Sequence, residues 1–468
     1  MRIHNTLTAR KEEFVPVTAH KAAIYWCGST VYDYMRIGNA RTHVVLDVVR
    51  RYLEYKGYDV TTVQNFTDVD DKIIERAAKE NVEPRDVSDK FIGEVMKEAR
   101  LLNVKDATFH PRVTDEMPEI IGMINELVEK GCAYERNGTV YYETGTFKEY
   151  GKLSHKNIED LIAGARVDIA EEKKSPADFV LWKPAKPGEP AWESPWGAGR
   201  PGWHIECSAM LRKYIGPTAD IHGGAEDLIF PHHENEIAQS EALTGKPLAK
   251  YWMHVRFLNM DHQKMSKSKG TMVTARELSD RFPYDVIRFF FVSANYGSPI
   301  NFSEDLLASS AASLQRIKNA VINLSFIIKN GVDAPLTTEE ETILKQADTY
   351  KDDFENAMDD DFNSADAVTA IFELVKFTNI NITEKSPKNF ASGLLDKITG
   401  LCDILGLKLN YAESDIDENE INDLIEQRNA AKKNKDYKTA DDIRSLLLNK
   451  NIVLEDTPSG VRWIYKGH

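Results

Sequence analysis

Apolar residues in the first part of the chain follow a strand period, then a helix period, then a strand period again. Residues 22–30, AAIYWCGST, form a short apolar run that enters a glycine-containing turn and predicts a buried strand. In residues 39–57, NARTHVVLDVVRRYLEYKG, apolar side chains recur at helical spacing as far as a glycine that can end the helix. Residues 59–65, DVTTVQN, alternate like a strand. Such a strand–helix–strand unit favours a parallel sheet that binds ligands at the carboxyl ends of its strands.

A second strand–helix–strand pattern covers residues 218–300. ADIHGG is a strand that enters a glycine turn, ENEIAQSEALTG is a helix, and KYWMHVRFLNM is a strand followed by a basic loop. The long insertion between the two patterns contains the strand-like GTVYYETGTF and closes at 183–203 with a loop rich in proline and glycine. We therefore predict an α/β fold in which one Rossmann-like parallel sheet is split by an inserted domain.

After residue 302 the apolar spacing becomes helical over four successive segments, which predicts a helical bundle. The acidic stretch AESDIDENEIND at 412–423 is either a linker or the start of a helix. The last segment, from residue 424 onward, is a small module in which basic residues are frequent.

Composition narrows the class of protein. A chain of 468 residues can form two to four domains, and its 42% hydrophobic and 28% charged residues are typical of soluble proteins. No apolar run reaches the roughly 18 residues of a membrane span, and the first residues contain no secretory signal, so we expect no membrane association and a cytoplasmic location. The net charge of -15 argues against indiscriminate binding to nucleic acid but leaves room for a local basic groove.

The first candidate site is the loop KMSKSKG at 264–270, in which three lysines alternate with small residues. Lysines supply positive charge and the small residues let the backbone approach a ligand, so the loop can wrap a polyphosphate. A solvated basic loop would have the same composition.

The second candidate is a metal site. His232 and Glu236 in PHHENE lie at positions i and i+4, so they face the same way from the start of a helix. Cys207 and Cys27 would complete a set of four ligands that suits tetrahedral zinc. The next histidine and glutamate of the same turn are equally available, and buried structural cysteines beside an ordinary histidine-rich turn remain the alternative. Four cysteines are too few for a disulfide framework in a chain of this length.

The third candidate is YDYMRIGNAR at 32–41, which has nearly the form of a nucleotide-binding turn built on His-Ile-Gly-His, with Arg36 and Asn39 at the two histidine positions. Asn39 can still offer an amide hydrogen bond. Arg36 keeps the positive charge and is a longer, multi-donor phosphate ligand. Our hypothesis is that Arg36 keeps a phosphate contact with altered geometry; the alternative is that it turns to solvent and another group replaces it.

Several motifs together resemble the cysteinyl-tRNA synthetase family of class I aminoacyl-tRNA synthetases. They are CGSTVYDYMRIGNAR, NFTDVDDKI, GWHIECSAM, DIHGG, FPHHENEIAQ, KMSKSKG, DYKTADDIRSLL and NIVLEDTPSGVRW, and they span the whole chain. The resemblance implies that one zinc ion per chain, held by Cys27, Cys207, His232 and Glu236, binds the thiol of the substrate cysteine. A soft thiolate is a far better zinc ligand than the hydroxyl of serine, whereas an apolar pocket separates such similar molecules by only about 1–3 kcal/mol.

The resemblance also implies a two-step reaction in which cysteine and ATP form cysteinyl-adenylate and a ribose hydroxyl of tRNA(Cys) then takes the cysteinyl group. The implied cysteine-pocket residues are Gly28, Thr30, Thr67 and Trp203. The implied ATP-binding residues, which act with Mg²⁺, are Arg36, Gly38, Asn39, His222, Asp227, Lys264, Met265, Ser266, Lys267 and Ser268. Three pocket residues have structural alternatives, because Gly28 could be a turn glycine, Thr67 a helix N-cap and Trp203 a core residue.

By the same resemblance the carboxyl-terminal half selects the tRNA, and the candidate anticodon contacts are Arg428, Lys432, Lys433 and Trp463. The expected domains are the first half of the catalytic domain (1–110), an inserted connective domain (111–200), the second half ending in the lysine loop (201–270), a stem-contact region (271–315), the helical bundle (316–410) and an anticodon-recognition module (411–468). We expect a monomer, because no apolar heptad is left over. The competing functions are an ATP-dependent cysteine ligase that acts on an amino sugar and a non-catalytic RNA-binding paralogue.

Overall fold

The computed structural model describes residues 1–156, 173–260, 263–264, 273–409, 418–450, 452–457 and 460–465. The chain divides into two compact units. Unit 1 comprises 1–258, 265–276 and 296–299, and unit 2 comprises 259–264, 277–295 and 300–468. In the parts of the chain that are described, no helix has the length and apolar character needed to cross a bilayer.

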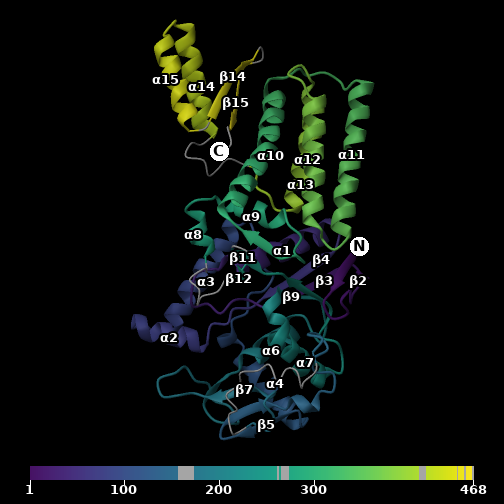
Figure 1. Ribbon diagram of the computed structural model, residues 1–468, viewed down its shortest axis with the longest axis vertical. Helices are drawn as coiled ribbons and strands as arrows, with labels where there is room; N and C mark the ends of the chain where they lie inside the picture. The colour runs from purple at the N-terminus through teal and green to yellow at the C-terminus, as the bar shows by residue number, and fades with distance from the viewer. Residues whose placement is uncertain are drawn as a thin grey trace. The chain divides into compact units, whose positions relative to one another are not determined.

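Unit 1 is built on a parallel four-stranded sheet, which confirms the sheet predicted from the sequence (Figure 1). Its strands in spatial order are β10 (Ala249–Val255), β9 (Ala219–Ala225), β3 (Lys21–Trp26) and β4 (Asp59–Gln64). The two inner strands come from the two separated halves of the chain, and Tyr25 is in register with His222. This pairing places the segment after β3 beside β9, although about 190 residues separate them in the sequence.

Helix α1 (Ile37–Tyr55) connects β3 to β4 and covers the sheet. The helix packs closely on β9. A Cβ atom at Gly223 of that strand would lie only 2.7 Å from Cδ2 of Leu46, so the absence of a side chain there allows the close approach. Helix α7 (Glu234–Thr244) connects β9 to β10 in the same way. Both predicted strand–helix–strand units are therefore present, and each places the start of its helix at the carboxyl end of a strand.

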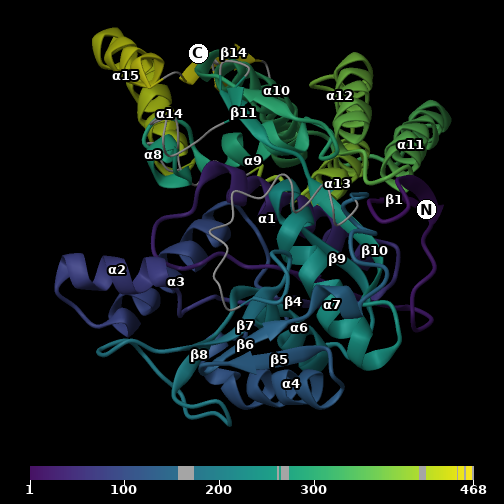
Figure 2. The ribbon, with the colours of Figure 1, turned by 60° about the horizontal axis from the view of Figure 1, so that its bottom comes forward.

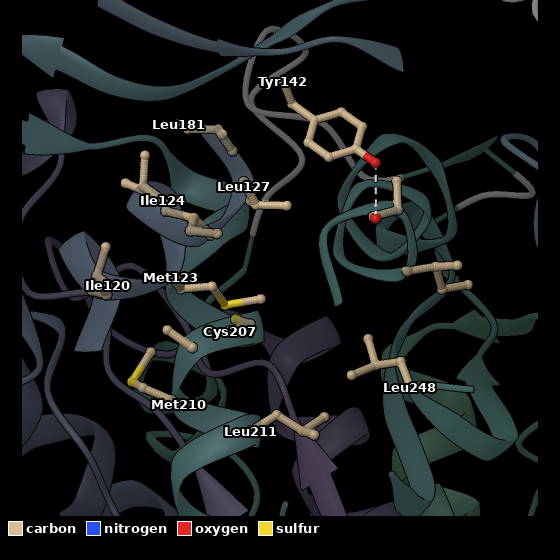
Figure 3. Close-up of a cluster of buried hydrophobic side chains, with 14 of the residues drawn as sticks. Ile120, Met123, Ile124, Leu127, Tyr142, Leu181, Cys207, Met210, Leu211 and Leu248 are labelled. Carbon is tan, nitrogen blue, oxygen red and sulfur yellow. Dashed lines mark hydrogen bonds between the residues drawn. The ribbon is translucent and has the colours of Figure 1, made fainter. Parts of the chain in front are cut away.

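The insertion forms a second, antiparallel sheet below the first in Figure 2. Its strands are β5 (Ala133–Arg136), β6 (Thr139–Tyr142), β7 (Phe179–Pro184) and β8 (Gly199–Pro201). Helices α4 (Met117–Glu129) and α6 (Trp203–Tyr214) pack against each other, and their apolar side chains share one buried cluster with this sheet (Figure 3). Tyr142 donates a hydrogen bond of 2.9 Å to the carbonyl oxygen of Ala238, which fastens the inserted sheet to α7.

The remaining elements of unit 1 include the helices α2 (Asp71–Glu80) and α3 (Pro84–Leu101), which were not among the elements expected from the sequence. The others are β1 (Arg2–Asn5), β2 (Arg10–Glu13), η1 (Val113–Asp115), η2 (Thr144–Thr146), η3 (Glu226–Leu228) and η4 (Ile229–His233). Helix α8 (Ala275–Ser279) follows the lysine loop.

Unit 2 contains the predicted bundle, whose four long helices run side by side in both views. They are α10 (Glu304–Asn330), α11 (Thr338–Asp359), α12 (Ser364–Asn381) and α13 (Lys388–Ile404). The other elements are β11 (Leu258–Met260), β12 (Gln263–Lys264), α9 (Tyr284–Val292), β13 (Ile300–Phe302), and the terminal α14 (Glu418–Lys433), α15 (Tyr437–Asn449), β14 (Ile452–Thr457) and β15 (Gly460–Tyr465). The acidic stretch at 412–423 contains the start of α14, while residues 410–417 lie outside the described part of the chain.

Candidate active site

Four potential metal ligands from distant parts of the sequence meet at the carboxyl edge of the parallel sheet. Cys27 follows β3, Cys207 lies in the second turn of α6, His232 lies in η4 and Glu236 lies in the first turn of α7. One potential ligand atom from each lies within 4.8 Å of the others. Three of the four side chains are buried and Cys27 is half-buried. The structure therefore brings together the four residues that the sequence singled out.

The contacts among these ligands are short. Sγ of Cys27 lies 3.3 Å from Oε1 of Glu236, and Nε2 of His232 lies 3.0 Å from the same oxygen. The other nitrogen of His232, Nδ1, is 2.9 Å from Nδ1 of His204, which fixes the orientation of the ring. In the described residues Nε2 of His232 has no hydrogen-bond partner of good geometry, although it is buried. A buried, unsatisfied imidazole nitrogen that faces a carboxylate and two thiols suits a cation.

Charge in the cluster is strongly perturbed. Burial raises the pKa of Cys27, and the neighbouring Cys207 and Glu236 raise it further. Burial also acts to raise the pKa of Cys207, but the neighbouring Cys27 and His232 lower it to about 6. The pKa of Glu236 lies well below its ordinary value, because two imidazoles outweigh the effect of burial. A buried carboxylate beside a readily ionised thiol makes the cluster a site for positive charge.

A second set of ligands overlaps with the first. His222 and His233 share Cys27 and Glu236 with it, and their ligand atoms also lie within 4.8 Å of one another. Nε2 of His222 is 2.8 Å from Oε2 of Glu236, and Nε2 of His233 is 3.4 Å from Sγ of Cys27. Geometry alone therefore leaves both sets possible. The first set has two thiols, and softer ligands favour zinc.

Asn65 supports the cluster from the end of β4. Its Oδ1 accepts a hydrogen bond of 2.8 Å from the backbone N–H of Gly28 and lies 3.8 Å from Sγ of Cys207. The backbone at Gly28 approaches so closely that a Cβ atom there would lie 1.6 Å from the carbonyl oxygen of Asn65. Only glycine fits this position without a movement of the backbone.

A pocket opens beside the cluster. Its lining includes Cys27, Gly28, Thr30, Arg36, Asn39, Trp203 and Asp227, which the sequence analysis had proposed as site residues. The ring centroid of Trp203 lies 4.2 Å from that of His232, and 42% of the Trp203 side chain is exposed. Trp203 therefore lies against His232 of the ligand cluster, in the lining of the pocket, and is not a core residue.

Two of the proposed pocket residues lie behind its surface. Thr67 is buried and donates a hydrogen bond of 2.8 Å to Oε2 of Glu206, and Asp70, not Thr67, caps α2. His222 was expected to contact ATP, but it is fully buried, stacks on Trp252 at 4.6 Å and binds Glu236. The structure corrects this expectation, because the imidazole of His222 contacts the ligand cluster through Glu236 and does not line the pocket.

The nucleotide-binding turn leads directly into α1. Arg36 is the N-cap residue of the helix, and its backbone pairs with Thr274 on the far side of the lysine loop. Its guanidinium donates a hydrogen bond to the hydroxyl of Tyr32. Asn39 donates a hydrogen bond of 3.0 Å from Nδ2 to Oγ of Ser29. Neither residue has turned away from the site, since both line the pocket.

Most of the lysine loop lies outside the described residues. The backbone of Lys264 belongs to β12, but its side chain and Met265, Ser266, Lys267 and Ser268 lie outside the described residues. Gly38 lies in the first turn of α1, with open space where a Cβ atom would stand.

The terminal module corrects two further expectations. Arg428 is 2% exposed and is held by both carboxylate oxygens of Asp456, each at 2.9 Å. Trp463 is 5% exposed and belongs to the apolar cluster of α14, α15 and the hairpin. Both side chains therefore hold the module together and are not presented to an RNA base. Lys432 also pairs with Asp456, at 2.8 Å, while Lys433 is exposed.

Sequence reasoning missed several neighbours of the site. His204, Asn65 and Glu206 each contact a residue of the proposed site, and Tyr32 and Lys72 line the pocket. The motifs that contain them, CGSTVYDYMRIGNAR, NFTDVDDKI and GWHIECSAM, are part of the resemblance, but nothing local indicates which of their polar residues turn inward.

Comparison with known proteins gives a consistent result. Residues 13–312 match the family described as tRNA synthetases class I (C) catalytic domain, and residues 353–410 match the DALR domain. The chain is 55% identical over 468 residues to a cysteine–tRNA ligase of Lachnoclostridium phytofermentans, with 99% of each chain covered. It is 51% identical over 463 residues to a cysteine–tRNA ligase of Clostridioides difficile, again with 99% of each covered.

Solved structures share the fold at low sequence identity. Mycobacterium tuberculosis methionyl-tRNA synthetase in complex with methionyl-adenylate has a TM-score of 0.60 and 15% identity, covering 82% of this chain and 89% of that one. A LeuRS of Agrobacterium radiobacter K84 in a ternary complex with tRNA has a TM-score of 0.62 and 10% identity, covering 85% and 86%. These two likenesses concern the fold alone.

Proposed function

The chain belongs to the cysteine–tRNA ligase family of class I aminoacyl-tRNA synthetases, and on this premise we propose that it uses ATP to attach L-cysteine to tRNA(Cys). One observation at the site itself supports the proposal. Cys27 belongs both to the buried ligand set and to the lining of the pocket that Arg36 and Asn39 also line. A metal-bound amino acid and a nucleotide would therefore share one pocket.

Zinc fits the residues that are present. Bonds of about 2.0–2.3 Å place the ligands of a tetrahedral zinc ion roughly 3.3–3.8 Å apart, and the limit of 4.8 Å among Cys27, Cys207, His232 and Glu236 is compatible with such a site after small movements. When bound, zinc would act as a Lewis acid that prefers the substrate thiolate to a hydroxyl, and it would so favour the binding of cysteine over serine. Asn65 and His204 would keep the ligands oriented from behind.

Adenylate formation asks the protein mainly for position and charge. The cysteine carboxylate is already ionised at neutral pH, so no general base is needed for its attack on the α-phosphate. Arg36 and the positive end of α1 stabilise the phosphates, with Mg²⁺ and the lysine loop as further sources of positive charge. Asp227, in the pocket lining, is available to the amino group of the substrate. Gly28, Thr30 and Trp203 enclose the rest of the amino acid.

In the second step a ribose hydroxyl at the end of the tRNA attacks the carbonyl carbon of the adenylate and AMP leaves. We assign the tRNA contacts to residues 271–315 at the stem, the bundle at 316–410 and the module at 411–468 near the anticodon, which belong mostly to unit 2. Within that module the exposed Lys433 stays a candidate contact, whereas Arg428 and Trp463 support the fold.

The test is cysteine-dependent exchange of pyrophosphate into ATP, followed by charging of a tRNA(Cys) transcript. We expect both activities with cysteine and almost none with serine. Cys207→Ser should lose exchange and bound zinc together, and Cys132→Ser, a half-buried cysteine outside the ligand set, should lose neither. Exchange without charging of tRNA would indicate a ligase for a small acceptor, and the absence of exchange would indicate a non-catalytic paralogue.

A further inference from the structure

Tyr32 and Lys72 line the pocket, and the reaction described above gives neither of them a role. Tyr32 precedes the turn that leads into α1 and is half-buried. Lys72 lies in the first turn of α2 and is exposed. The two residues come from separate elements and meet at the rim of the pocket.

The ring of Tyr32 is in contact with two cations. Cζ of Arg36 lies 5.9 Å from the ring centroid and Nζ of Lys72 lies 5.6 Å from it. Both distances are within the range of a cation–π interaction. The hydroxyl of the same ring accepts the hydrogen bond from Arg36. Tyr32 therefore gathers two positive side chains at one place.

No carboxylate neutralises these two cations in the parts of the chain that the structure describes. Asp33 also lines the pocket, but it pairs with Arg76 at 3.1 Å, and Arg76 pairs in turn with Glu80 at 2.7 Å. Two like charges that share one aromatic ring repel each other, and an aromatic quadrupole offsets this only in part. An anion bound at this rim of the pocket would offset the positive charge of both side chains.

The adjacent helix end adds to the positive potential. α1 begins after Arg36 with no side-chain cap and with no acidic residue in its first turn. The N–H of Ile37 is bonded to the carbonyl oxygen of Val273, so the helix dipole and the N–H groups that follow Ile37 are what favour an anion at this end of the pocket. The helix end and the cation pair share Arg36, and both favour the same kind of ligand.

We propose that Lys72, Arg36 and Tyr32 form a phosphate clamp at the rim of the pocket, in which the two cations bind phosphoryl oxygens and Tyr32 is the positioning residue that holds them. The proposal rests on the proposed function for the source of the phosphate, which is either the triphosphate of ATP or a phosphodiester near the end of the RNA. Both sources present the same charged oxygens to Lys72.

The central experiment measures KM values for Lys72→Ala, with Lys79→Ala as the matched control. Lys79 lies in the last turn of the same helix, is exposed and does not line the pocket. We expect Lys72→Ala to raise one KM about tenfold, near the lower limit for a hydrogen bond to a charged group, and Lys72→Arg to restore most of it. A higher KM for ATP in the exchange reaction assigns the triphosphate, and a higher KM for tRNA in charging alone assigns the RNA.

Two variants of Tyr32 test its positioning role. Tyr32→Phe keeps the ring and loses the bond to Arg36, whereas Tyr32→Leu loses both. If the ring holds Lys72, Tyr32→Leu should raise the same KM as Lys72→Ala, and adding Lys72→Ala to it should have little further effect. Independent, multiplicative effects of the two changes would overturn the positioning role of Tyr32.

Direct binding of magnesium pyrophosphate, measured by calorimetry on the full chain, separates this proposal from the proposed function. Weaker binding by Lys72→Ala than by Lys79→Ala supports the clamp even if cysteine-dependent exchange is absent. The clamp is overturned if Lys72→Ala matches Lys79→Ala in pyrophosphate affinity and in both KM values.

Discussion

The guanidinium of Arg41 donates a hydrogen bond of 2.6 Å to the carbonyl oxygen of Arg256. It also donates to the carbonyl oxygens of Phe257 at 3.3 Å and of Ser298 at 2.9 Å. Arg41 lies on α1 as the last residue of the stretch 32–41, while Arg256 and Phe257 follow β10 and lead toward the lysine loop. One buried side chain thus joins the two segments that carry the nucleotide motifs.

We expect Arg41→Met to destabilise this junction. The substitution removes the part-buried hydrogen bonds of a charged donor, and hydrogen bonds that involve a charged group are worth about 1.5–3 kcal/mol each. Urea denaturation should show a lower free energy of unfolding, and the exchange rate should fall with it because the two motifs lose their common support. Lys56→Met, at the exposed end of the same helix, is the control. Equal stability of the two variants would contradict this role.

The two overlapping ligand sets can be separated by their histidines. If the metal is held by the set with two cysteines, His232→Gln should lose nearly all bound zinc and His233→Gln should retain it. The measurement is zinc content of the purified chain by mass spectrometry, which does not depend on activity. The reverse pattern would assign the metal to the set that contains His222 and His233.

Gly28 and Gly38 form a matched pair for substitution by alanine. A Cβ atom at Gly28 would collide with the carbonyl oxygen of Asn65, whereas one at Gly38 would meet no atom within 4 Å. We expect Gly28→Ala to cost about 1–3 kcal/mol or more, as overpacked interiors do, and Gly38→Ala to leave stability nearly unchanged. The measurement is the unfolding temperature of each variant. An unchanged unfolding temperature in Gly28→Ala would show that the turn can move.

Glu98 should make stability depend on pH. Burial raises the pKa of Glu98, whose Oε2 accepts a hydrogen bond from the backbone N–H of Met35, to about 7. The folded chain therefore keeps this proton up to about pH 7, while the unfolded chain releases it near pH 4.3. Stability from this group falls as pH rises from about 4.3 through 7, by at most about 4 kcal/mol.

Glu98→Gln removes that dependence. The variant should match the native chain near pH 5 and exceed its unfolding temperature at pH 8, with the difference growing through neutral pH. Glu75→Gln, on an exposed position of α2, serves as the control and should show no such trend. A difference that stays constant from pH 5 to 8 would contradict the raised pKa.

Arg36 should be a competent substitute for histidine. Arg36→Met removes a positioned donor, which typically costs about 10²–10³ in rate, and we expect that loss in cysteine-dependent exchange. Arg36→His should stay within about tenfold of the native rate, because either side chain can donate to a phosphate. A gain on the order of 10²-fold in Arg36→His would refute the hypothesis.

Much of this protein could be predicted from its sequence because the relevant forces are local. The apolar spacing of residues 39–57 and 59–65 indicated α1 and β4, since one helical or strand face must be buried whatever it packs against. The bundle after residue 302 was predictable for the same reason. The residue types at Cys27, Cys207, His232 and Glu236 also indicated a metal site.

Tertiary structure decided what local pattern could not. Sequence offered His232 and His233 equally, and only the order β10-β9-β3-β4 places Cys27 beside both of them. Arg428 and Trp463 have the composition of an RNA contact, yet Asp456 and an apolar cluster hold them inside. Burial and pairing depend on groups far away in the chain, so neither periodicity nor residue type can predict them. The sequence determined the helices, the strands and the residue types available for a site. The packing of distant segments decided which of these side chains meet.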